Sequence, residues 1–145
     1  MAVAKRTLDE LDERGWLRLF LGHLADKPFA FPRLLLDHVA WQIRAETKRS
    51  NGPKTLREWS FRSDTRHLYS ETLEEAVKEA LSLKNCVVDA DDQFQIQKPN
   101  ELKRMKEETL ELLTAADRAL AMRWAGKFRQ FLLDECERRG ITHSL

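Results

Sequence analysis

The feature that most constrains the fold is a proline-free stretch from Asn100 to Arg139, which contains a single glycine, Gly126. Apolar side chains recur through this stretch at helical spacing, at Met105, Leu112, Leu113, Ala116, Leu120, Trp124, Phe128, Phe131 and Leu132. Gly140 follows, and glycine readily adopts the left-handed conformation in which many helices end. The pattern predicts one long C-terminal helix, or two helices that are nearly collinear.

Further helix signals occur along the rest of the chain. Thr7, Thr55 and Thr72 each begin a Thr-x-x-Glu capping box, a pattern typical of helix N-termini. A helix ending near Arg49 is predicted by an apolar stripe, formed by Leu36, Val39, Ala40, Ile43 and Thr47. We expect Trp124 and Phe128 to be buried against that stripe.

These signals predict an all-α fold. We expect one helical domain over residues 1–145, a bundle of about five helices with a long C-terminal helix. The periodicity changes between residues 86 and 97, where two short segments fit either a β-ribbon or a loop.

Length and composition exclude several classes of protein. A chain of 145 residues can bury a substantial core. No apolar run approaches the ~18 residues that span a bilayer, and we expect no signal peptide. Cys86 and Cys136 lack a CxxC partner, which is typical of buried thiols. We therefore expect a cytoplasmic protein with no membrane partner.

The formal net charge of +1 conceals an uneven distribution of charge. Residues 43–67 carry seven basic and three acidic side chains, whereas residues 71–92 carry seven acidic and two basic ones. Such asymmetry influences association more than the total charge does. Two interpretations remain open: the blocks neutralise each other within the fold, or the basic block is available to a partner.

Motifs for catalysis and metal binding are weak. Asp89, Asp91 and Asp92 suggest a calcium loop, but the glycine and glutamate that an EF-hand requires are replaced by Phe94 and Asn100. The histidines form no HExxH motif, and the five glycines are isolated, which excludes a phosphate-binding P-loop. We expect no metal and no cofactor.

One enzymatic alternative rests on paired glutamates. Glu71 with Glu74, and Glu108 with Glu111, match the ExxE spacing that helical pyrophosphatases use on two helices. This spacing is common wherever glutamate is abundant, so we expect a protein that is not an enzyme.

The basic block is the main candidate for function. It comprises Arg44, Lys48, Arg49, Lys54, Arg57, Arg62 and Arg66. Trp59, Phe61, His67 and Tyr69 are interleaved with these cations, and this mixture suits phosphate neutralisation together with base stacking. In the alternative interpretation, Trp59 and Phe61 belong to the core and the arginine side chains lie around them.

A second group of cations lies on the C-terminal segment Ala121-Met-Arg-Trp-Ala-Gly-Lys-Phe-Arg-Gln-Phe-Leu-Leu133. This segment resembles the closing helix of some small subunits of type I CRISPR interference (Cascade) complexes, which are compact helical bundles of similar length. In that family the small subunit contacts the DNA backbone through basic side chains. The resemblance implies that Arg123, Lys127 and Arg129 contact nucleic acid, and that the chain serves in antiviral defence.

Together these patterns predict a non-enzymatic helical accessory subunit of a larger nucleoprotein assembly. We expect other protein subunits and the nucleic-acid backbone as partners, contacted independently of base sequence because no base-reading motif is present. The alternative is a protein–protein interaction subunit of a multisubunit complex with no role in nucleic-acid binding.

Overall fold

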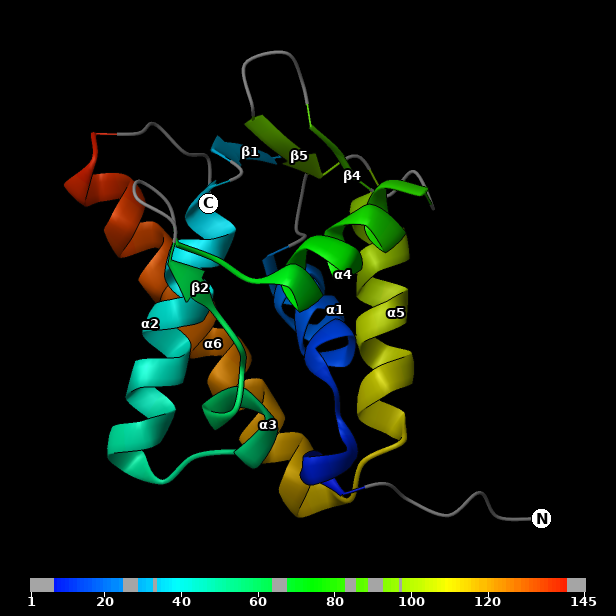
Figure 1. Ribbon diagram of the computed structural model, residues 1–145. Helices are drawn as coiled ribbons and strands as arrows, with labels where there is room; N and C mark the ends of the chain where they lie inside the picture. Colours follow the sequence, from blue (N-terminus) through cyan, green and yellow to red (C-terminus); the bar gives the residue numbers. More distant parts are fainter. Residues whose placement is uncertain are drawn as a thin grey trace.

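Helices form most of the protein in the computed structural model (Figure 1). The structure describes residues 7–24, 29–32, 34–63, 68–82, 86–88, 93–96 and 98–140. Its α-helices are α1 (Glu13–Leu24), α2 (Leu34–Ser50), α3 (Lys54–Arg57), α4 (Glu71–Ser82), α5 (Pro99–Glu111) and α6 (Ala115–Arg138), preceded by the 3-10 turn η1 (Leu8–Glu10). The predicted helical bundle with a long C-terminal helix is confirmed.

Helix α1 is the centre of the bundle and contacts α4, α5 and α6 (Figure 1). Its sequence is more apolar than that of a surface helix, and Trp16, Phe20 and Leu24 are fully buried. Gly22 lets α5 approach closely, because a Cβ atom there would lie 2.8 Å from the carbonyl oxygen of Leu102. Helix α1 is therefore buried on several sides, and it packs against α4 as well as against the C-terminal helices α5 and α6.

The C-terminal stretch forms two helices, but they are not collinear. Helix α5 ends at Glu111, and α6 turns back across the bundle to pack on α1 and α2 (Figure 1). Thr114 caps the new helix, since its side-chain oxygen accepts a hydrogen bond of 3.3 Å from the amide of Asp117. The prediction of a single helical axis was therefore wrong.

The predicted contact between the long helix and the core is confirmed. Trp124 and Phe128 are both buried, and they belong to the same cluster as the stripe of α2. Phe128 stacks on Phe20 of α1, with ring centroids 4.4 Å apart. The apolar face of α6 is thus held between α1 and α2.

Short strands complete the fold. Strands β4 (Cys86–Val88) and β5 (Gln93–Ile96) pair antiparallel, which confirms the ribbon alternative for residues 86–97. Strand β1 (Phe29–Pro32) adds to the other edge of β5, with Phe29 opposite Ile96. A separate pair joins β2 (Arg62–Ser63) to β3 (Leu68–Tyr69). Phe94 and Ile96 are buried, so β5 presents alternate side chains to the core.

Three helix starts differ from the predicted capping boxes. The Thr7 side chain makes no capping bond, and Asp12 instead accepts from the amide of Gly15 at 2.8 Å, at the start of α1. Helix α3 begins at Lys54, and the Thr55 hydroxyl accepts from the Trp16 indole instead. Helix α4 begins at Glu71, and the Ser70 hydroxyl accepts from the amide of Leu73 in its first turn. In each case a neighbouring residue supplies the cap or the hydroxyl has a tertiary partner.

Candidate nucleic-acid interface

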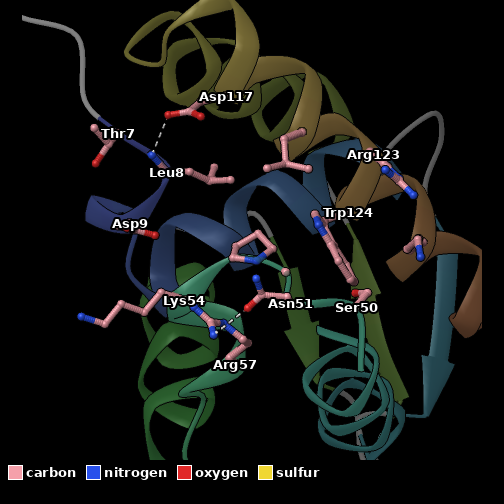
Figure 2. Close-up of a pocket in the computed structure, with 14 residues that line it drawn as sticks. Thr7, Leu8, Asp9, Ser50, Asn51, Lys54, Arg57, Asp117, Arg123 and Trp124 are labelled. Atoms are coloured by element: carbon pink, nitrogen blue, oxygen red, sulfur yellow. Dashed lines mark hydrogen bonds between the residues drawn. The ribbon is translucent and has the colours of Figure 1, made fainter. Parts of the chain in front are cut away.

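A pocket of about 440 Å³ lies where the α2–α3 turn, η1 and α6 meet (Figure 2). We call it the basic pocket. It is lined by Thr7, Leu8, Asp9, Ser50, Asn51, Gly52, Pro53, Lys54, Arg57, Asp117, Leu120, Arg123, Trp124 and Lys127. The pocket thus brings two cations of the 43–67 block together with two cations of the C-terminal helix, although they are far apart in sequence.

The turn between α2 and α3 sets the floor of the pocket. Asn51 adopts a left-handed conformation with φ of 53°, and the amide of Gly52 donates to the carbonyl of Thr47 at 2.8 Å. A Cβ atom on Gly52 would lie only 2.7 Å from Cζ2 of Trp124. The absence of a side chain at Gly52 therefore lets the turn press against α6 and places α3 beside it.

The four cations differ in how they are held. Lys54 and Arg123 are exposed, and no ion pair joins either of them to a described carboxylate. Arg57 donates from Nη1 to Oδ1 of Asn51 at 3.2 Å, while its buried Nε has no acceptor among the described residues. Lys127 lies 4.8 Å from the centroid of the Trp124 ring and 3.6 Å from a Glu46 oxygen. Lys54, Arg123 and the Arg57 Nε thus have unused capacity for an anion.

Two carboxylates also line the pocket. Oδ2 of Asp117 accepts a 3.0 Å hydrogen bond from the amide of Leu8, which fastens η1 to the start of α6 (Figure 2). Asp117 therefore has a structural partner, and Asp9 is exposed. Four cations against two carboxylates leave the lining with an excess of positive charge. An anionic group such as a phosphate fits this balance best.

Neither Trp124 nor Trp59 offers a platform for base stacking, and His67, which was part of that prediction, lies outside the described residues. Trp124 is only 4 % exposed, and Lys127 lies over its ring. Trp59 is buried, and the guanidinium of Arg44 lies 4.8 Å from the ring centroid of Phe61. The alternative interpretation, in which Trp59 belongs to the core, is therefore the one the structure supports.

The remaining predicted cations lie outside the basic pocket. Arg44 donates to the carbonyl of Trp59 at 3.0 Å and holds the end of α3 against α2. Lys48 is exposed near the end of α2, and Arg49 is paired with Glu46 on the same helix. Arg129 lies on α6 but does not line the pocket.

Two predicted cations lie near or beyond the limits of the described structure. Arg62 begins β2, where its backbone pairs with Tyr69. Arg66 lies outside the described residues, as do the acidic residues 89–92 that suggested calcium.

The acidic helix α4 forms ion pairs with α1. Glu79 forms ion pairs with Arg14 and Arg18, and Glu75 lies 3.5 Å from Arg14. Glu75 and Glu79 of α4 are thus held by cations of α1, and neither of them lines the basic pocket.

The two pairs of glutamates lie on separate helices, α4 and α5. Glu71 and Glu74 begin α4, whereas Glu108 lies near the end of α5, where it pairs with Arg104. Helix α1 contacts both of these helices. Across the described ranges, no group of three or more His, Cys, Asp and Glu side chains is placed to hold a metal ion.

The sequence matches no known protein-family model. Neither a curated protein nor a solved structure shows significant similarity to it. None of the helices in the described residues is both long and apolar enough to cross a membrane.

Proposed function

We propose that this chain is a non-enzymatic helical subunit of a larger nucleoprotein assembly, and that it contacts the nucleic-acid backbone through the basic pocket. The observation that carries the proposal is the meeting of Lys54 and Arg57 with Arg123 and Lys127 around one concavity. Lys54 and Arg123 form no ion pair with a described carboxylate, and cations that lie together in this way are suited to neutralising consecutive phosphates.

The C-terminal segment supports the same proposal. In the segment that resembles Cascade small subunits, Ala121, Trp124, Ala125, Phe128 and Leu132 are buried. Packing therefore accounts for its apolar residues, whereas Arg123 and Lys127 face the pocket. A role as a small subunit in CRISPR-based antiviral defence is the specific form of the proposal.

Contact is independent of base sequence in this proposal. Trp124 is covered and Trp59 is buried, so the pocket offers charge without a stacking surface. Backbone contacts fix position but carry no sequence information. Oligonucleotides of unrelated sequence should therefore bind with similar affinity.

The test is the salt dependence of binding to labelled random oligonucleotides, measured by fluorescence anisotropy. The variant Lys54→Gln/Arg123→Gln removes two exposed charges that make no ion pair with a described residue. Each lost contact flattens the slope of log K against log salt by about 0.7 for single strands or 0.9 for double strands, so the pair should flatten it by roughly 1.4 to 1.8.

The matched control is Lys78→Gln/Lys98→Gln, which removes two exposed charges away from the pocket. This control should leave affinity and slope close to those of the parent protein. Equal effects of the two variants, or no effect of either, would contradict the proposal and favour a protein–protein interaction subunit.

A further inference from the structure

One carboxylate beside the basic pocket holds a cation that lines it. Oε1 of Glu46 on α2 lies 3.6 Å from Nζ of Lys127 on α6, and Glu46 itself is not part of the lining. The structure describes this ion pair for Lys127 but none for Lys54 or Arg123. A phosphate that reaches Lys127 therefore has to compete with a carboxylate of the protein, whereas one that reaches Lys54 or Arg123 has no described carboxylate to displace.

Two contacts position the ammonium group of Lys127. Besides the carboxylate of Glu46, it faces the ring of Trp124, whose centroid lies 4.8 Å away, within the range of a cation–π interaction. Helices α2 and α6 pack against each other, so both contacts come from elements that the core holds in place. The ammonium group has three N–H donors, and the Lys127 side chain is 30 % exposed. Lys127 can therefore exchange the carboxylate for a phosphate oxygen by rotation of its side chain.

Glu46 also pairs with a second cation of the basic block. Its Oε2 accepts a hydrogen bond from Nη2 of Arg49, which lies one turn further along α2. The Arg49 side chain is 77 % exposed, so water and salt screen this pair more than the pair with Lys127. The contact of Glu46 that bears most on the pocket is thus the one with Lys127.

We infer that Glu46 regulates the basic pocket by competing with phosphate for Lys127. Lys54 and Arg123 contact phosphates directly, whereas Lys127 adds its contact only when it leaves Glu46. The ion pair thereby lowers the affinity of the pocket and withholds one contact that would release a counterion. This inference rests on the proposed function of the pocket, whose regulation it specifies.

The test compares Glu46→Gln with the parent protein in the anisotropy assay with random oligonucleotides. The amide has nearly the shape of the carboxylate but no charge, so the substitution releases Lys127. Partly exposed ion pairs contribute little free energy, and the loss of this one should raise the affinity by roughly 1.5- to 5-fold. The slope of log K against log salt should steepen by about 0.7 for single strands or 0.9 for double strands. Circular dichroism verifies that the variant folds.

A double-mutant cycle separates this competition from the general effect of removing a negative charge. In a Lys127→Gln background, Glu46→Gln should change neither the affinity nor the salt slope, because the cation that it releases is absent. The control is Asp9→Asn, which removes an exposed carboxylate from the pocket lining. Its effect on affinity should be the same in the parent protein and in the Lys127→Gln background.

The inference is overturned if Glu46→Gln does not raise the affinity of the parent protein. It is also overturned if the gain is equally large in the Lys127→Gln background. In both cases the proposed function stands as long as the parent protein binds and Lys54→Gln/Arg123→Gln weakens that binding. A parent protein that binds no oligonucleotide would overturn the proposed function and the inference together.

Discussion

Replacing Trp124 tests the packing that shapes the basic pocket. The side chain is 4 % exposed and touches both the α2–α3 turn and Lys127. Truncating a buried tryptophan to alanine costs about 3–5 kcal/mol, because apolar burial is lost and a cavity remains. The neighbouring pocket lets water enter part of that cavity. We therefore expect the lower end of the range, about 3 kcal/mol for Trp124→Ala.

That free energy converts into a clear thermal shift. With about 2.1 cal/mol/K of unfolding entropy per residue, a chain of 145 residues has roughly 0.3 kcal/mol/K. A loss of about 3 kcal/mol should then lower Tm by about 10 °C, measured by circular dichroism at 222 nm and checked by urea unfolding. Trp41→Ala is the matched control, and its exposed side chain should cost less than about 1 kcal/mol. A loss below about 1 kcal/mol for Trp124→Ala would refute the packing argument.

The remaining predictions concern two glycines and one buried carboxylate. Gly22→Ala should destabilise the fold by about 1–3 kcal/mol, measured by urea unfolding, because the added Cβ atom meets α5. The Cβ atom added by Gly126→Ala meets nothing within 4 Å, so this variant should stabilise α6 by roughly 0.5–1 kcal/mol. Equal effects of the two substitutions on the free energy of unfolding would contradict both predictions. Burial alone would raise the pKa of Glu135, but the hydrogen bond from Arg139 and the nearby positive charges lower the pKa below 4.5. Glu135→Gln should therefore cost about 1.5–3 kcal/mol at pH 7, and this difference should shrink as the pH falls below 4.5 and through the lower folded pKa. A difference that does not change with pH would refute the assignment.

Local periodicity was enough to predict the helices, because each apolar stripe reports burial on one face. The stripe of α2 from Leu36 to Thr47 is fully buried, and the segment around Trp124 packs as expected. The break before α6 also has a local signal: Thr114 stands three residues before Asp117, which is the spacing of a capped helix start. That signal was overlooked in favour of the longer apolar pattern.

Long-range pairing was beyond prediction from local patterns. Strand β1 pairs with β5 across more than sixty residues, and no local feature of Phe29–Pro32 specifies that partner. The basic pocket has the same origin, since Lys54 and Arg123 approach only after α6 turns back on α2. Asp117 and η1 were missed as pocket residues because their contact joins positions 109 residues apart. Charge clustering predicted Lys54 and Arg57, and the resemblance of the C-terminal segment predicted Arg123 and Lys127, but neither pattern predicted that the four would line one pocket.

The central position of α1 has a consequence for synthesis of the chain. Its buried face is completed by α5 and α6, which are synthesised well after it. Roughly ninety residues separate the end of α1 from the start of α6, which corresponds to a delay on the order of 5–20 s at ordinary elongation rates. During that interval Trp16, Phe20 and Leu24 have no C-terminal partners to cover them. The nascent chain therefore exposes the apolar face of α1 until α5 and α6 have been synthesised and can pack against it.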